Sequence, residues 1–316
     1  MDVADSAILT GANGMNGEEI MAHAKLKRML ESGEFFYAPG AQDMIAATVA
    51  SRHGFDALYA SGYWLTASAY GLPDAGIVSY TQMLDRVSLL ARQAGDTPVI
   101  ADADTGYGGL LNVDHTVRGY EAAGVTAIQL EDQEFPKKCG HTPFKRVVPA
   151  DVMATKIRVA VEARNDPNFL VIARTDALQP EGFEAALARA ELYGQAGADI
   201  VFVEAMTERD QMQEACRRIT KPVIANMASG GQTPILSISE LKEIGFACAI
   251  FPALSSLAAA AAMDKAYAVL KAEGIATSPD VPLFDFGQFS RMIGFEEVWA
   301  FERKWADAQP SDDNAT

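Results

Sequence analysis

The chain has 316 residues, 49% of them hydrophobic and 22% charged, and 26 Lys and Arg against 42 Asp and Glu give a net charge of −16. This composition excludes a disordered or collagen-like chain and is ample for a full hydrophobic core. The acidic balance also makes nucleic acid and anionic membranes poor partners, so any anionic ligand needs positive charge supplied locally.

Cysteine usage and the chain's apolar runs bear on location. Three cysteines without a C-x-x-C spacing favour a reducing, cytoplasmic setting over a disulfide framework. The N-terminal sequence lacks the features of a secretory signal, and residues 1–30 are expected to form an arm and a helix. The long uncharged run 246–263 contains Pro252, so we predict a strand, a turn and a helix there instead of a membrane span.

Short apolar segments alternate with helical stretches along the chain. The eight predicted strands are Phe35–Ala38, Ala57–Ala60, Val99–Ala103, Thr126–Leu130, Leu170–Ala173, Ile200–Val203, Val223–Ala225 and Ala249–Phe251. Helical periodicity is clearest in Tyr80–Ala94, Val152–Ala163, Phe183–Ala196 and Met212–Ile219. Several of these helices end in glycine, which tolerates the left-handed backbone of a helix end. The repeated order of helix, glycine and strand indicates consecutive βα units.

Eight βα units predict an α/β fold with a closed (β/α)₈ TIM-type barrel over residues 31–275. A doubly wound sheet is the alternative, but no glycine-rich phosphate fingerprint follows the first predicted strand. Residues 276–316 are expected to form a C-terminal helical extension. Within it, residues 294–306 carry large apolar side chains at helical spacing, which pack either on the same barrel or on another subunit.

Polar residues follow several predicted strands, at the end of a barrel where active sites are built. Asp102 and Asp104 are two residues apart and are therefore expected on one face of a strand. Two such carboxylates repel unless a cation lies between them, and Mg²⁺ commonly takes one or two protein carboxylates. Glu131 and Asp132 follow the next strand and could contact metal-bound water. The alternative for Asp102 and Asp104 is a pair of solvated or helix-capping aspartates. The alternative for Glu131 and Asp132 is a salt-bridged loop end.

A basic loop spans residues 137–146 and contains Lys137, Cys139 and His141. Positive neighbours predict a lowered pKa for the Cys139 thiol, which would prepare it to exchange a proton or attack carbon. The alternative is a surface loop whose charges are only solvated.

Arg174 ends the fifth predicted strand, where its guanidinium fits a carboxylate with two parallel hydrogen bonds. An internal salt bridge to Glu204 is the alternative. His23, His53 and His115 show no ligand spacing, and we assign them no chemistry.

Together these motifs resemble the isocitrate lyase/phosphoenolpyruvate mutase superfamily. The matching segments are Tyr59-Ala60-Ser61-Gly62, Gly71-Leu72-Pro73-Asp74, Asp102-Ala103-Asp104-Thr105-Gly106-Tyr107-Gly108, Glu131-Asp132-Gln133, Lys137-Lys138-Cys139-Gly140-His141, Ala173-Arg174-Thr175-Asp176-Ala177 and Asn226-Met227. The cysteine loop is similar to that of the carbon–carbon lyase branch, which includes 2-methylisocitrate and 2,3-dimethylmalate lyases; mutases and phosphonopyruvate hydrolases carry asparagine there. The resemblance implies a modified barrel, a gating loop, and homotetramers whose dimers exchange C-terminal helices.

The resemblance also implies roles for individual residues. The expected ligands of a Mg²⁺ or Mn²⁺ ion, directly or through water, are Asp102, Asp104, Asp74 and Glu131. The expected contacts to a small carboxylic acid substrate are Ser61, Gly62, Tyr63, Arg174, Glu204 and Asn226. The expected catalytic residues are Tyr59, Lys137, Cys139 and His141. Among them, Tyr59 is the expected base and Cys139 the acid that protonates a carbanion.

The implied reaction is the Mg²⁺-dependent cleavage of a 2-hydroxy acid into an α-keto acid, pyruvate or glyoxylate, and a second carboxylic acid. Two departures from the tricarboxylate lyases favour a substituted malate over 2-methylisocitrate: Tyr63-Trp64 stands where small glycines are usual, and no glutamate follows Asn226 closely. An oxaloacetate hydrolase or decarboxylase on the same scaffold is the main rival. A phosphonopyruvate-type enzyme and a noncatalytic barrel are the remaining alternatives.

Overall fold

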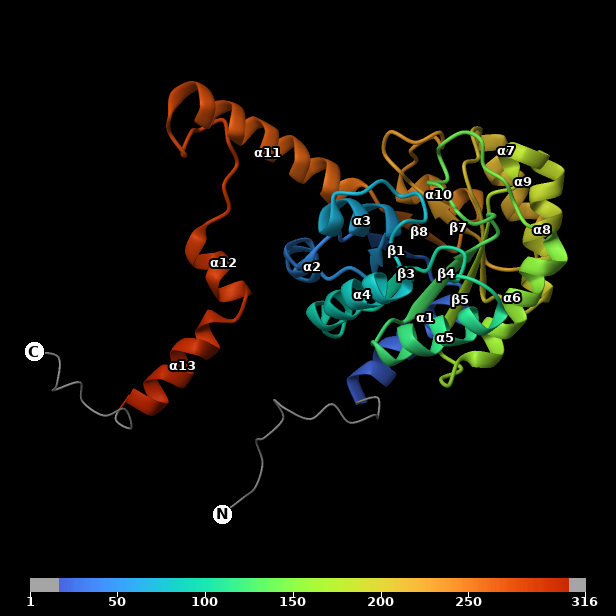
Figure 1. Cartoon of the computed structure of the whole chain (residues 1–316), viewed down its shortest axis with the longest axis horizontal. Coiled ribbons are helices and arrows are strands. Elements are labelled where there is room, and N and C mark those ends of the chain that lie inside the picture. The colour runs from blue at the N-terminus through green and yellow to red at the C-terminus, as the bar shows by residue number, and fades with distance from the viewer. Residues whose placement is uncertain (1–16, 307–316) are drawn as a thin grey trace, which may run out of the picture. The chain divides into compact units, whose positions relative to one another are not determined.

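The computed structural model describes residues 17–306, so residues 1–16 of the predicted arm and 307–316 of the predicted extension lie outside the described residues (Figure 1). Its strands are β1 Phe36–Pro39, β2 Leu58–Ala60, β3 Val99–Asp102, β4 Ala127–Glu131, β5 Leu170–Thr175, β6 Ile200–Val203, β7 Ile224–Asn226 and β8 Cys248–Phe251. All eight predicted strands are present, with ends that shift by at most two residues.

The strands form a ring of parallel neighbours. Hydrogen-bonded ladders join β2 through β6 into one sheet and β7, β8 and β1 into another. Single parallel bridges connect the two sheets at both seams, Gly40 with Tyr59 and Val201 with Val223. Every strand therefore has a neighbour on each side, and the predicted (β/α)₈ barrel is confirmed.

Helices surround these strands (Figure 1). They are α2 Met44–Ser51, α3 Gly62–Tyr70, α4 Tyr80–Ala94, α5 Leu110–Ala122, α6 Ala150–Ala163, α7 Leu178–Glu181, α8 Phe183–Gln195, α9 Arg209–Arg218 and α10 Ile238–Ile244. Every residue of β3 to β6 is buried, as expected for parallel strands covered on both faces. The larger core cluster fills the space between strands and helices.

A smaller core cluster fills the barrel interior and includes the first helix, α1 (Gly17–Ser32). Leu26 and Met29 of α1 pack with inward-facing residues near the strand starts, such as Phe36 and Leu170. This helix therefore closes the N-terminal end of the barrel, and the opposite end is left for the strand-end polar residues.

The chain divides into two compact units after Ser256. The predicted barrel boundary at residue 275 falls later than this division, because α11 (Leu254–Glu273) continues past it as one helix in which only Ser256 is buried. The second unit also contains α12 (Phe286–Met292) and α13 (Phe295–Trp305), which matches the predicted C-terminal helix. Among residues 17–306, no helix combines the length and apolar character needed to cross a membrane.

Candidate active site

Asp102, the last residue of β3, and Asp104, two residues later, both lie beside Gly62 at the start of α3. β3 ends at Asp102 and Asp104 adopts a left-handed backbone with φ 49°, so the predicted placement of both on one strand face is wrong. Instead, the Asp104 N–H donates to Asp102 Oδ1 at 3.0 Å and the Gly62 N–H donates to Asp102 Oδ2 at 3.3 Å. A Cβ on Gly62 would lie 2.9 Å from Asp102 Oδ2 and 3.3 Å from Asp104 Oδ1, so both carboxylates require glycine here.

Lys137 is buried between two of the predicted metal ligands. Its Nζ lies 2.5 Å from Asp74 Oδ1 and 2.6 Å from Asp104 Oδ1, and only 2% of its side chain is exposed. Burial disfavours the ammonium, but Asp104 and Asp74 raise the pKa of Lys137 well above its usual value. The loop thus contributes a fixed positive charge to the aspartate cluster, and the alternative of a surface loop whose charges are only solvated does not hold at this residue.

The barrel mouth has an excess of negative charge. Six carboxylates (Asp74, Asp102, Asp104, Glu131, Asp176 and Glu204) share three cations (Lys137, Lys145 and Arg174). Burial raises the pKa of Asp104 to about 7, with Lys137 opposing the shift and Asp102 adding to it. Burial likewise raises the pKa of Glu131, whose Oε1 is buried without a hydrogen-bond partner among the described residues.

This donor set fits a hard divalent cation. All of its donor atoms are oxygens, they are buried, and the excess negative charge is what a cation would neutralise. Among residues 17–306, no group of three His, Cys, Asp or Glu side chains is arranged to bind a metal ion by itself. The fit is therefore to an ion such as Mg²⁺, which binds through one or two carboxylates and keeps several water molecules.

Arg174 is surrounded by carboxylates. Its Nε and Nη2 donate to Asp176 at 2.9 and 3.0 Å, Nη2 lies 3.2 Å from Glu204 Oε2, and Nε lies 3.4 Å from Glu131 Oε2. The internal salt bridge to Glu204, the alternative to a substrate contact, is therefore present. Because these partners hold the guanidinium at the barrel mouth, a substrate carboxylate would meet an oriented cation.

Asn226 and His141 converge on Glu204. Asn226 Nδ2 donates to both Glu204 oxygens at 3.3 and 3.2 Å, and His141 Nε2 lies 3.6 Å from Glu204 Oε1. The Gln232 N–H donates to His141 Nδ1 at 3.2 Å, which leaves Nε2 as the protonated nitrogen that faces Glu204. Asn226 Oδ1 is buried without a hydrogen-bond partner in the described residues and is available to a ligand.

The loop that carries Cys139 lies across both clusters. The Cys139 N–H donates to the Asp74 carbonyl at 3.2 Å, and the next residue, Gly140, packs against Arg174 and Glu204. Burial raises the pKa of the half-buried Cys139 thiol, although Arg174 opposes this effect. The predicted lowering of this pKa is therefore wrong, because desolvation outweighs the nearby cations. A protonated thiol suits proton donation better than nucleophilic attack.

Gly140→Ala is expected to displace this loop. A Cβ there would lie 2.1 Å from Arg174 Nη2 and 2.6 Å from Glu204 Cγ, so the loop must move outward. Because misplacement of a catalytic group by about 1 Å costs on the order of 100-fold, kcat should fall by about that factor. The control is Gly109→Ala, where the nearest atom lies 4.0 Å from the new Cβ. Equal kcat values for the two variants and wild type would contradict the loop position.

Tyr59 points into the barrel from β2, and its hydroxyl donates to Gln129 Oε1 at 3.2 Å. Burial, followed by the charge of Asp102, raises the pKa of Tyr59 well above its usual value. An un-ionised phenol with this pKa does not fit the predicted role of base and fits a hydrogen-bonding role better. Gln129 was not predicted, although it lies two residues before Glu131 on β4 and so shares its inward direction.

Asp132 has the structural role of a salt-bridged loop end, the alternative given for it above. Its carboxylate accepts hydrogen bonds from the hydroxyls of Thr175 and Tyr193 and from the Asp176 N–H, at 2.7, 2.8 and 2.8 Å. Arg189 Nη1 lies 3.3 Å away. Asp132 therefore fixes the end of β5, and both of its carboxylate oxygens are engaged by protein donors.

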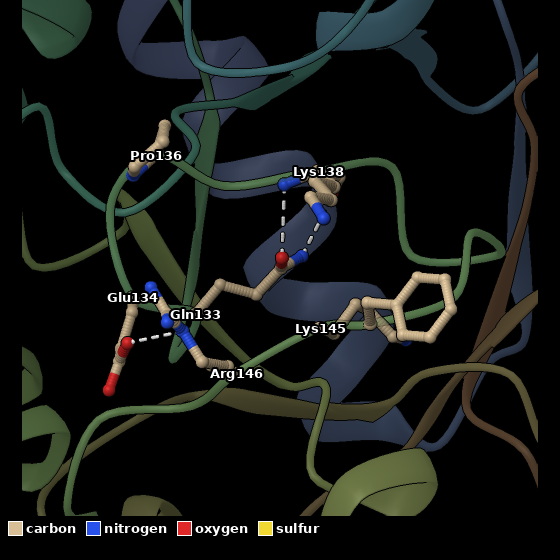
Figure 2. A pocket seen from close by; sticks show the side chains of 7 residues that line it. Gln133, Glu134, Pro136, Lys138, Lys145 and Arg146 are labelled. Carbon is tan, nitrogen blue, oxygen red and sulfur yellow. Dashed lines mark hydrogen bonds and ion pairs between the residues drawn. The ribbon is translucent and has the colours of Figure 1, made fainter.

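Ser61 and Tyr63 flank Gly62 at the start of α3. Ser61 is buried, whereas Tyr63 is 39% exposed and its ring lies 4.7 Å from that of Trp64. A cavity of about 590 Å³ lies elsewhere, in the outer part of the cysteine loop (Figure 2). Its lining includes Gln133, Phe144 and Arg146 but neither Cys139 nor Arg174, and of the site's cations only Lys145 borders it.

Comparisons with known proteins found similar sequences and similar structures. The family model described as phosphoenolpyruvate phosphomutase matches residues 26–271. The chain is 40% identical to a 2,3-dimethylmalate lyase of Eubacterium barkeri, over 90% of this chain and 98% of that protein. It is also 40% identical to a 2-methylisocitrate lyase of Bacillus subtilis, over 83% of this chain and 85% of that protein. A solved structure of oxaloacetate acetylhydrolase with the inhibitor 3,3-difluorooxalacetate superposes with a TM-score of 0.85 at 32% identity. The match covers 91% of this chain and 98% of that one.

Proposed function

This chain is a lyase-type enzyme of the phosphoenolpyruvate mutase/isocitrate lyase superfamily, and we propose that it cleaves a substituted malate into an α-keto acid and a second carboxylic acid. One observation carries the proposal: the Cys139 loop contacts both the aspartate cluster, through Asp74, and the Arg174 cluster, through Gly140. The groups that would donate a proton, hold a cation and bind a carboxylate therefore lie together.

Asp102 and Asp104 would hold a Mg²⁺ ion, with Asp74 and Glu131 on its water molecules. When bound, this ion lowers the pKa of a coordinated hydroxyl and stabilises negative charge on neighbouring oxygens. Lys137 forms an ion pair with both Asp74 and Asp104 while the loop covers them. The loop also limits the access of water, which would otherwise protonate a carbanion without selectivity.

The chain's own residues then account for binding and proton transfer. Arg174 binds a substrate carboxylate, and Asn226 and His141 contact the second one. A buried carboxylate of the barrel mouth, such as Glu131, whose pKa is raised by burial, accepts the 2-hydroxyl proton; the adjacent C–C bond then breaks, which forms the keto group and leaves the enediolate of the second acid. The Cys139 thiol donates its proton to the enediolate carbon, and the hydroxyl proton restores the thiol, so that no water is consumed.

We favour a substrate of the 2,3-dimethylmalate type. The bulk of Tyr63 and Trp64 at the start of α3 argues for a smaller substrate than 2-methylisocitrate, and the relative from Eubacterium barkeri is a 2,3-dimethylmalate lyase. The likeness to oxaloacetate acetylhydrolase supports oxaloacetate cleavage as the second candidate.

A panel of four substrates tests these assignments. With Mg²⁺ present, 2,3-dimethylmalate should release pyruvate with a kcat/KM at least about tenfold above that for 2-methylisocitrate or citramalate, a difference of about 1.4 kcal/mol. Coupled lactate dehydrogenase reports pyruvate, and chromatography reports oxalate and acetate from oxaloacetate. Preferred turnover of oxaloacetate would replace the first candidate with the second, and no turnover of any of the four would reject the proposed function.

We also propose a homotetramer, in which the second unit packs against other subunits. Several large apolar side chains of this unit are exposed in the single chain, including Phe286 at 84%, Tyr267 at 67% and Phe301 at 66%. Exposed apolar surface of this extent is typical of an interface.

A further inference from the structure

Lys145 is a buried lysine in the loop that carries Cys139. Its side chain is 0% exposed, whereas the residues on either side of it are exposed. Its Nζ lies 2.9 Å from Asp176 Oδ1 and also donates to the carbonyl of Gly140. Burying an ammonium is costly unless it is paired and hydrogen-bonded, and both conditions are met here. Lys145 therefore joins the residue after Cys139 to the end of β5.

Asp176 is a rigid attachment point for this lysine. The same carboxylate accepts two hydrogen bonds from Arg174, and the Asp176 N–H donates to Asp132 Oδ1 at 2.8 Å. Arg174 in turn lies against Gly140, where a Cβ would be 2.1 Å from Nη2. Lys145, Gly140, Arg174 and Asp176 thus form a closed circuit of contacts between the loop and the barrel.

A second anchor holds the other side of the turn. Gln133 Nε2 donates to the Lys138 carbonyl at 2.7 Å, and the Lys138 N–H donates to Gln133 Oε1 at 3.0 Å (Figure 2). Within the turn, the Thr142 hydroxyl donates to the Cys139 carbonyl at 2.7 Å. Cys139 is therefore placed between a neutral anchor at Gln133 and a charged anchor at Lys145.

We propose that Lys145 is a positioning residue. Its ammonium bridges the Gly140 carbonyl and the Asp176 carboxylate, and this bridge fixes the Cys139 thiol over the Arg174 cluster. Removal of its charge releases the turn, and the half-buried thiol becomes accessible. The kinetic consequences rest on the proposed function, whereas the accessibility of the thiol does not.

The first test measures alkylation of Cys139 by iodoacetamide. It uses a Cys216→Ser background, since Cys248 is fully buried. Breaking a buried ion pair costs several kcal/mol, so Lys145→Met should raise the alkylation rate by about tenfold or more. Loss of a nearby cation would by itself raise the thiol pKa and slow alkylation, so an increase reports exposure. The matched control is Lys138→Met, which removes a charge from an exposed position in the same loop, and should change the rate by less than about twofold.

Lys145→Arg keeps a cation beside Asp176 and guards against a Lys145→Met variant that does not fold. Its planar guanidinium does not reproduce the geometry of the two Nζ contacts to Gly140 and Asp176, so an alkylation rate above the wild-type rate is expected. A folded Lys145→Met variant with the wild-type rate would overturn the positioning role. So would a wild-type rate in Lys145→Arg if Lys145→Met fails to fold.

A kinetic measurement separates this inference from the proposed function. In an active enzyme, Lys145→Met should lower kcat for keto-acid release by about tenfold or more with a smaller change in KM, because the thiol acts after substrate binds. If alkylation rises but no substrate is cleaved by wild type, the proposed function fails and the positioning role stands. If kcat and KM of the variant are unchanged in an active enzyme, the positioning role fails.

Discussion

Cys139→Ser is expected to lower kcat by about 10³-fold while KM changes little, because positioned proton donors contribute on the order of 10²–10⁴ to rate. Serine preserves the shape of the side chain but is a much weaker acid than a thiol. Burial raises the pKa of Cys139, so the thiol is the dominant form at neutral pH. The measurement is steady-state keto-acid release by the folded variant.

Cys216→Ser is the matched control, since Cys216 lies on α9 and is not part of the site. Two further readouts apply to Cys139→Ser. Wild-type activity should fall as pH rises through the thiol pKa, which lies above the usual value of about 8.5, and this limb should be absent from the residual activity of the variant. Product formed in D₂O by the variant should lose its stereospecific deuterium label. Wild-type turnover by Cys139→Ser would remove the thiol from the mechanism.

Removal of divalent metal with EDTA is expected to abolish turnover, and added Mg²⁺ or Mn²⁺ to restore it. The reason is the buried excess of negative charge around Asp102, Asp104 and Glu131, which the nearby lysine and arginine do not balance. Full activity after EDTA treatment, with metal content verified by mass spectrometry, would contradict a metal role.

Asp104→Asn tests the same site without relying on activity. In metal-free protein, isothermal titration calorimetry should show Mg²⁺ affinity reduced by about tenfold or more, equivalent to about 1.4 kcal/mol. Asp96→Asn is the matched control. Asp96 lies in an exposed position before β3, and its substitution changes the net charge by the same amount. Equal affinity in the two variants would exclude Asp104 as a ligand.

The fold was predictable because each βα unit repeats the same local signals. Apolar runs of three to five residues, helical periodicity and closing glycines determine the order of strands and helices, and they need no long-range information. The barrel boundary was less predictable. The periodicity of α11 continues through Ser256 without a change in composition, so the point where the helix leaves the core depends on packing alone.

The site was predictable as a set of residues but not as a set of environments. Strand-end positions identify Asp102, Glu131 and Arg174 because parallel strands direct their ends to one face. The depth at which the loop lies is set by contacts between distant segments, such as Lys137 with Asp74 and Lys145 with Asp176. That depth decides the sign of the pKa shift at Cys139. The metal, the homotetramer and the cytoplasmic location stay predictions.

The two seams of the barrel divide the site unequally. Asp102, Glu131, Arg174 and the Cys139 loop all come from the five-stranded sheet or the connections between its strands, whereas Asn226 lies on β7 across a seam with a single bridge. The hydrogen bonds from Asn226 to Glu204 therefore span this seam and couple the two sheets at the mouth. A substitution at Asn226 would loosen that coupling and leave the groups of the five-stranded sheet in their mutual positions.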